Sequence, residues 1–212
     1  MTIDPEATTG LCFGDSNTNG ATPDKSGRYP SDVRWTGQLQ RILGDSYYVI
    51  EEGLGGRTTD SDHFREGKPG RNGFTYYKPA LETHLPLNVV VIMLGTNDVK
   101  NTYNKTPEEI AHSLAEYVEY TRDVVNEKGI KKPKIILVSP APIDERSIQD
   151  VYDETSVQKS LELADKIKAV ADRLDCVFID GGDYARVGED GIHLTRESNE
   201  PLAQAIAVAI KS

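Results

Sequence analysis

The segment Asn88–Leu94, with the sequence NVVVIML, constrains the fold of this chain more than any other feature. After Asn88 every residue is apolar, without the alternation of a half-exposed strand, so both faces of the segment must be buried. A strand of this kind is typical of a parallel sheet that helices cover on both sides. The chain has no apolar run long enough for a transmembrane helix. The segment therefore predicts the central strand of an α/β protein.

Shorter apolar runs and segments of helical periodicity alternate along the rest of the chain. The apolar runs predict four further strands, at 11–13, 47–50, 134–139 and 176–179. Amphipathic spacing predicts four helices, at 33–43, 106–128, 156–174 and 199–210. Because this alternation implies βαβ crossovers, we predict one domain over residues 1–212, with a parallel sheet of about five strands between two layers of helices.

The charge of the chain narrows the choice of partners. Lys and Arg number 24 against 34 Asp and Glu, which gives a formal net charge of -10. Such a surface repels the phosphates of nucleic acids and anionic membranes, so we expect neither as a partner. The segment Met1–Thr9 lacks the basic and apolar regions of a secretory signal, which favours a cytoplasmic location.

The two cysteines, Cys12 and Cys176, both lie in predicted strands. Buried free thiols are the better interpretation in a reducing cytosol, where a disulfide is not expected. The sequence contains no Cys-x-x-Cys or His-x-x-x-His spacing. We therefore predict no metal site and no cofactor.

Unusual polar turns follow the predicted strands. They are Gly14-Asp15-Ser16, Gly55-Gly56, Gly95-Thr96-Asn97-Asp98 and, in the closing loop, Asp190-Gly191-Ile192-His193. Each alone has an ordinary interpretation, as a surface turn, an Asx turn, a glycine pair for positive φ, or a loop histidine. Since the carboxyl ends of parallel strands meet at one edge of a sheet, their joint occurrence favours a single reactive site.

The residue types in these turns suit nucleophilic catalysis. A serine hydroxyl such as Ser16 needs a base within hydrogen-bond reach, and His193 can serve. Asp190, three residues earlier, can hold the imidazole in the required tautomer. The backbone N–H groups of Ser16 and Gly56 and the side-chain amide of Asn97 can supply the donors of an oxyanion hole.

These four turns resemble the four sequence blocks of the SGNH (GDSL-type) hydrolases, over residues 11–195. Longer strings are similar to the bacterial arylesterase/acyltransferase branch of that family, at 32–37, 49–54, 57–59, 83–87 and 92–98. The resemblance implies a flavodoxin-like three-layer α/β/α sandwich, with Ser16 as nucleophile, His193 as base and Asp190 orienting it. It also implies an oxyanion hole of Ser16, Gly56 and Asn97. By analogy with the branch, it implies a homo-oligomer.

The sequence departs from the pattern of the family beside the nucleophile. Asn17 stands where leucine is common, and Asn19 and Ala21 stand where the branch tends to have tryptophan. These polar and small residues favour a small acyl group or a polar alcohol. With Asn17, Lys100 and Ile192 flank the catalytic turns and are candidate pocket residues.

Several nearby residues receive structural interpretations. The segment Ser61–Tyr77 matches the branch poorly and is predicted to form a loop over the site. Arg57 is expected to form an ion pair with Glu51, Glu52 or an aspartate. Trp35 is expected to pack under the first helix.

The leading functional hypothesis is a serine esterase that hydrolyses small-acyl esters through an acyl-enzyme, with acyl transfer to an alcohol as a further activity. A carbohydrate O-acetyl esterase and an acyl thioesterase are alternatives on the same fold. A non-enzymatic module that holds a small anion or carbohydrate at Gly53–Gly56 is the alternative from another class. The absence of a Gly-x-Gly-x-x-Gly pattern disfavours it.

Overall fold

The computed structural model describes residues 6–212 and contains a five-stranded parallel sheet in the order β2-β1-β3-β4-β5. The strands are β1 (Thr8–Gly14), β2 (Tyr47–Gly53), β3 (Val89–Met93), β4 (Lys134–Ser139) and β5 (Val177–Asp180). This is the flavodoxin-like strand order, so the predicted fold class is confirmed. The first five residues, part of the segment predicted to hold no secretory signal, lie outside the described residues.

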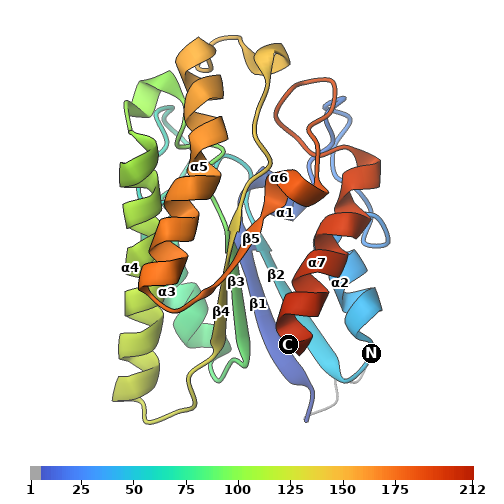
Figure 1. Cartoon of the computed structure of the whole chain (residues 1–212), viewed down its shortest axis with the longest axis vertical. Coiled ribbons are helices and arrows are strands. Elements are labelled where there is room, and N and C mark those ends of the chain that lie inside the picture. The colour runs from blue at the N-terminus through green and yellow to red at the C-terminus, as the bar shows by residue number, and fades with distance from the viewer. Residues whose placement is uncertain (1–5) are drawn as a thin grey trace.

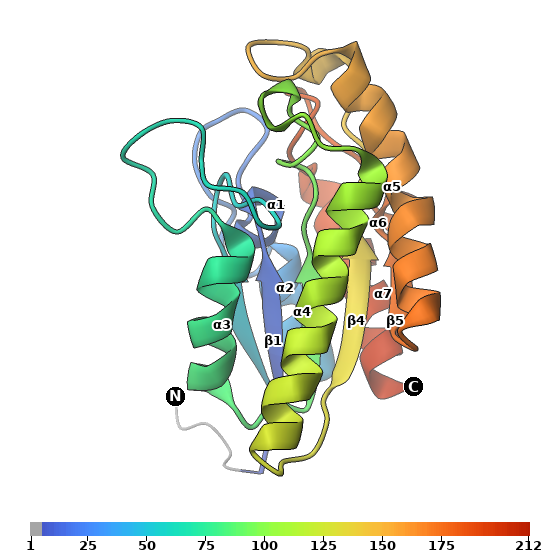
Figure 2. The same ribbon diagram turned by 90° about the vertical axis from the view of Figure 1, so that its left-hand side faces the viewer.

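Helices cover both faces of the sheet. They are α1 (Ser16–Asn19), α2 (Trp35–Leu43), α3 (Gly73–His84), α4 (Pro107–Glu127), α5 (Glu154–Arg173), α6 (Gly181–Tyr184) and α7 (Asn199–Lys211). Figure 1 shows α3, α4 and α5 on one side of the sheet and α2 and α7 on the other. The loops that follow the strands gather at one end of the molecule, at the top of Figures 1 and 2.

Strand β3 lies at the centre of the sheet because neither of its faces is polar. Its five residues are all buried. Val89, Val91 and Met93 join the core beneath α2 and α7, whereas Val90 and Ile92 join the core beneath α3, α4 and α5. Each such side chain contributes roughly 1.5–3 kcal/mol when it is buried. The prediction from the apolar run is confirmed.

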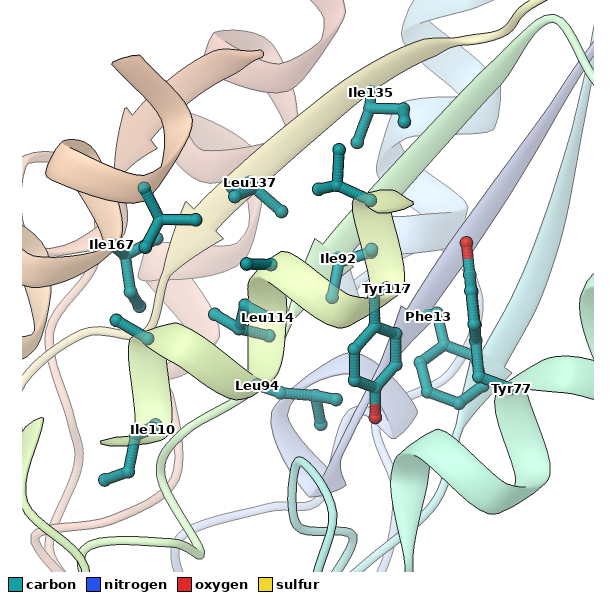
Figure 3. Packing of buried hydrophobic residues seen from close by; sticks show 14 of the residues in the cluster. Phe13, Tyr77, Ile92, Leu94, Ile110, Leu114, Tyr117, Ile135, Leu137 and Ile167 are labelled. Carbon is teal, nitrogen blue, oxygen red and sulfur yellow. The ribbon is translucent and has the colours of Figure 1, made fainter. Parts of the chain in front are cut away.

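Aromatic side chains fasten α3 and α4 to β1, close to the end of that strand (Figure 3). The ring centroids of Phe13 and Tyr77 lie 5.0 Å apart, edge to face, and those of Tyr77 and Tyr117 lie 4.7 Å apart. The hydroxyl of Tyr117 donates to the backbone carbonyl of Thr59 at 2.5 Å. The same cluster therefore anchors both the strand that leads to Ser16 and the segment that follows β2.

The prediction of a loop over Ser61–Tyr77 is wrong for its last five residues, 73–77. Helix α3 begins at Gly73, where the side chain of Asn72 accepts a hydrogen bond from the backbone N–H of Thr75 at 3.1 Å. Glycine at its start and Pro79 within it weaken the helical pattern in the sequence. Residues 61–72 do form a loop, as part of the longer connection 54–72, which arches outward at the upper left of Figure 2.

The helix predicted from Val33 begins two residues later, at Trp35, because Arg34 keeps an extended backbone as its N-cap. Trp35 is fully buried and belongs to the core between α2, α7 and the sheet, as expected. Within residues 6–212, no helix has both the length and the apolar character needed to cross a membrane.

Candidate active site

The turn that holds Ser16 is fixed by close packing at the end of β1. A Cβ at Gly14 would come within 2.0 Å of the Thr18 hydroxyl and 2.7 Å of the Met93 carbonyl oxygen, so only glycine fits. Asp15 then caps α1, its carboxylate accepting from the backbone N–H of Asn17 at 2.8 Å. As a result Ser16 is the first helical residue, at the carboxyl edge of the sheet. Asp15 therefore supports this turn through the backbone.

Three side chains predicted to react together form a continuous chain of hydrogen bonds. Nε2 of His193 lies 3.0 Å from Oγ of Ser16, and Nδ1 of His193 lies 2.6 Å from Oδ2 of Asp190. An ionised carboxylate only accepts hydrogen bonds, so Nδ1 carries the proton and Nε2 accepts from the serine hydroxyl. The geometry therefore leaves His193 ready to remove the proton of Ser16.

The environment of Asp190 keeps its carboxyl group ionised. Burial favours the neutral form, but bonds from the His193 ring and from the backbone N–H groups of His193 and Ile192 outweigh it and hold the pKa of Asp190 below its usual value. The turn needs glycine at 191, where φ is +69° and a Cβ would lie 2.5 Å from the Ser147 nitrogen. Short-range geometry thus brings the carboxylate to the imidazole.

The side-chain amide of Asn17 joins α1 to the loop of His193. Its Nδ2 donates to the carbonyl of Ile192 at 3.3 Å, and its Oδ1 accepts from the N–H of Leu194 at 3.0 Å. The two bonds flank His193 on either side, and Asn17 is buried. Leucine at this position can make neither bond. Asn17, a candidate pocket residue, thus has both ends of its amide bonded to the backbone.

Replacing Asn17 by leucine is expected to lower kcat by roughly 10–100-fold, because a displaced imidazole no longer aligns with Ser16. Steady-state hydrolysis of p-nitrophenyl acetate measures this. Asn19→Leu is the matched control, since the Asn19 amide donates to the Gly53 carbonyl at 3.2 Å and does not contact the histidine loop. Equal losses of kcat in the two variants would contradict a specific role for Asn17.

The two oxyanion donors predicted beyond Ser16 come from neighbouring strand ends. Gly56 has a φ of +80°, and a Cβ built on the adjacent Gly55 lies 4.0 Å from that of Ser16. Nδ2 of Asn97 donates to the carbonyl of Arg57 at 3.0 Å and approaches Oδ2 of Asp15 at 3.4 Å. The second contact is long, so the hydrogen that makes it is only weakly bonded and remains available to an acceptor beside Ser16.

Arg57 corrects one prediction from the sequence. Its guanidinium donates to the backbone carbonyl of Gly14 at 2.8 Å and to that of Glu52, and lies 4.1 Å from the ring centroid of Phe13. Within the described part of the chain no carboxylate pairs with it, whereas Glu51 pairs with Arg34 at 2.5 Å. The predicted ion pair is wrong because the side chain enters beneath the nucleophile turn, where its contacts are backbone carbonyls and aromatic rings.

Arg57→Met is expected to lower the free energy of unfolding by about 1–3 kcal/mol, because the carbonyl groups of Gly14 and Glu52 lose a buried donor. Urea unfolding measures the change. In Arg41→Met, the control, the lost side chain is 59% exposed and pairs on the surface with Glu200, so a loss below about 1 kcal/mol is expected. A similar, small loss in both variants would show that the buried contacts of Arg57 are unimportant.

The remaining candidates lie around this centre. Lys100 is buried and donates to Oδ1 of Asn97 at 2.7 Å, and Ile192 packs, half-buried, at the edge of the core. Two further residues close to this centre, His63 and Phe64, are not among the candidates predicted from the sequence. The His63 ring lies 3.4 Å from the position of a Cβ at Gly56 and stacks on Phe64. No motif marks these two residues, since their position depends on how the 54–72 loop folds back.

Asp98 stands apart from the reacting groups. Its carboxylate accepts from the backbone N–H of Thr59 at 2.9 Å and from the Thr59 hydroxyl at 2.6 Å. Asp98 therefore supports the segment that follows β2. Across residues 6–212 no cluster of three or more His, Cys, Asp or Glu side chains could hold a metal ion.

Comparison with known proteins identifies the family. Residues 12–200 match the GDSL-like lipase/acylhydrolase family. The inhibitor-bound aryl esterase of M. smegmatis shares 39% sequence identity and a TM-score of 0.89, over 97% of this chain and 99% of that one. A carbohydrate acetylesterase from Sinorhizobium meliloti shares 39% identity and a TM-score of 0.88, over 96% and 98% of the two chains.

One curated relative is considerably longer than this chain. An acetylxylan esterase from Xylanibacter ruminicola is 30% identical over 94% of this chain, which spans 42% of the length of that protein. The family match and the structural likeness confirm the resemblance of this chain to the SGNH (GDSL-type) hydrolases. This chain belongs to the GDSL-like lipase/acylhydrolase family and is a hydrolase of that family.

Proposed function

We propose that this protein is a serine esterase that hydrolyses esters of small acyl groups, with Ser16, His193 and Asp190 as its catalytic triad. The single observation that carries the proposal is the unbroken chain from the Ser16 hydroxyl to the His193 imidazole at 3.0 Å and on to the Asp190 carboxylate at 2.6 Å. A positioned base and an orienting carboxylate are what a serine needs to become a nucleophile.

In the proposed reaction, Oγ of Ser16 attacks the ester carbonyl while Nε2 of His193 takes its proton. The negative oxygen that forms accepts hydrogen bonds from the backbone N–H groups of Ser16 and Gly56 and from Nδ2 of Asn97. His193 then gives the proton to the departing alcohol, which leaves the acyl group on Ser16. Water, activated by the same imidazole, releases the acid and restores the serine. An alcohol in place of water gives acyl transfer.

We infer the preference for a small acyl group from the rings that limit the space beside the proposed oxyanion donors. The His63 ring lies against Gly56, and Phe64 stacks on it with ring centroids 4.6 Å apart. Asn17 no longer supports this preference, because its amide is bonded to the backbone of residues 192 and 194. The name of the similar carbohydrate acetylesterase agrees with a short acyl chain.

A series of p-nitrophenyl esters tests the proposal directly. We expect kcat/KM to be highest for the acetate and to fall at least tenfold by the octanoate, because a longer chain must displace the two rings. His63→Ala and Phe64→Ala should narrow that difference, with Tyr184→Ala as control because that exposed side chain contacts neither ring. A folded protein without activity on any ester of the series would contradict the proposed function.

The acetyl group of a carbohydrate is the second candidate substrate. A groove of about 560 Å³ lies between residues of the segment 22–30 and residues 188, 189 and 195–197, which flank the loop of His193. It is lined by charged and hydroxyl-bearing residues, among them Asp24, Arg28 and Glu197, which suit sugar hydroxyls. Acetylated xylo-oligosaccharides compared with phenyl acetate distinguish the two candidates. A higher kcat/KM on the oligosaccharides would favour the carbohydrate.

A further inference from the structure

Lys100 is a buried ammonium group whose main partner is a neutral amide. The residue is 7% exposed, and its Nζ donates to Oδ1 of Asn97 at 2.7 Å. No carboxylate of the described chain lies within ion-pair distance of it, whereas the nearby Lys105 pairs with Asp60 and Asp98. Burying an ammonium group without a paired charge is costly, so the contact with Asn97 must be a specific feature of the site.

The contact fixes which way the Asn97 amide faces. An ammonium group can only donate and a backbone carbonyl can only accept, so Oδ1 must face Lys100 and Nδ2 must face the carbonyl of Arg57. One hydrogen of Nδ2 is donated to that carbonyl. The other points to the turn of Ser16, where the Asp15 carboxylate accepts it in a long, weak contact of 3.4 Å. With the amide reversed, an oxygen would face the developing oxyanion and repel it.

The surroundings of Lys100 keep it charged at neutral pH. Burial lowers the pKa of Lys100 to about 8, and the repulsion of Arg65 and Lys68 in the 54–72 loop acts in the same direction. The attraction of Asp15 and Asp98 raises the pKa and opposes both effects. Burial also raises the pKa of Asp15 to about 6, which leaves that carboxylate ionised at pH 7 and above. The rings of Tyr152 and Phe64, with centroids 5.3 and 5.8 Å from Nζ, complete the enclosure, and His63 lies in the same loop as Phe64.

We propose that Lys100 is a positioning residue that orients and polarises the Asn97 amide, so that Nδ2 donates a stronger hydrogen bond to the oxyanion formed at Ser16. The inference rests on the proposed esterase function. Hydrogen bonds in series strengthen one another, and a charged donor on Oδ1 draws electron density from the amide nitrogen. Lys100 thus acts through Asn97 and touches no substrate atom.

A double-mutant cycle tests this dependence. Asn97→Ala is expected to lower kcat by about 10²–10³-fold, as is typical when one oxyanion donor is removed. Lys100→Met should lower kcat by roughly 10–100-fold with little change in KM, and should have almost no further effect in the Asn97→Ala background. Lys105→Met is the control and should leave kcat close to that of the unaltered protein, because its ammonium contacts Asp60 and Asp98.

The pH dependence of kcat distinguishes a charged hydrogen-bond donor at position 100 from a side chain that only fills space. The contribution of Lys100 to kcat is full below its pKa and declines as the pH rises through about 8, since the neutral amine is a weaker donor. Lys100→Met should lack this alkaline decline. Lys100→Arg should retain activity and shift the decline to higher pH, because a guanidinium stays charged.

Nuclear magnetic resonance of the Asn97 side-chain amide gives a readout that does not depend on turnover. In the unaltered protein its ¹⁵N and ¹H shifts should titrate near pH 8, and in Lys100→Met they should not. Additive losses in the cycle, or an Asn97 amide that does not respond to Lys100, would overturn the inference while leaving the esterase function intact. If the unaltered protein hydrolyses no ester, the proposed function fails, and the titration still decides whether Lys100 controls the amide.

Discussion

Replacing Ser16 by alanine is expected to lower kcat on p-nitrophenyl acetate by about 10⁵–10⁶-fold, because the acyl-enzyme route then has no nucleophile. The substitution removes only the hydroxyl group, whose hydrogen-bond partner in the structure is Nε2 of His193. The backbone N–H of Ser16 and the cap from Asp15 stay in place, so the fold should be unchanged. Stopped-flow and steady-state assays, with thermal unfolding of the same sample, measure both effects.

Ser46→Ala is the control for this prediction, since Ser46 is exposed in the turn before β2, at the opposite end of that strand from the site. It should hydrolyse the ester at the rate of the unaltered protein. A folded Ser16→Ala protein that keeps most of its kcat would contradict the assignment of Ser16 as nucleophile.

The second large effect is expected from Asp190→Asn, which should lower kcat by about 10⁴-fold. An asparagine amide can donate to Nδ1 of His193, which moves the imidazole proton to Nε2 and leaves no lone pair for the Ser16 hydroxyl. Two of the three bonds that Asp190 makes come from backbone N–H groups and survive in an asparagine whose oxygen keeps the place of Oδ1. The loss of kcat therefore comes from the changed tautomer of His193 more than from a change in the structure of the loop.

Glu189→Gln gives the matched control for Asp190→Asn. It neutralises an exposed acid in the same loop, one residue away, and should change kcat on p-nitrophenyl acetate little. Comparable losses in both variants would mean that the charge of the loop, and not the tautomer of His193, controls the rate.

The sequence predicts the sheet well because each strand carries its own signal. The unbroken apolar run of β3 can be satisfied only between two layers of helices, and all five of its residues are buried. Helix α3 lacks such a signal: Gly73 and Pro79 disfavour a helix locally. What stabilises it is long-range packing of Tyr77 on Phe13 and Tyr117, which no local pattern reveals.

The candidate site also contains some residues that the sequence predicts and others that it does not. Ser16, Asp190 and His193 belong to short motifs at predictable strand ends, so the sequence alone predicts that they lie close together. The residues that support them bond across many positions in the sequence: Asn17 to Leu194, and Arg57 to Gly14. Their roles depend on the directions of individual side chains, which is why the sequence suggests an ion pair for Arg57 that does not form.

We propose Ser16 as the nucleophile of an esterase, and labelling with a fluorophosphonate followed by mass spectrometry of the peptides is the sharpest test of that role. We expect a single covalent adduct on Ser16, loss of hydrolysis in step with labelling, and no labelling of Ser16→Ala. An adduct on another serine, or a folded protein that hydrolyses esters without reacting at Ser16, would contradict it.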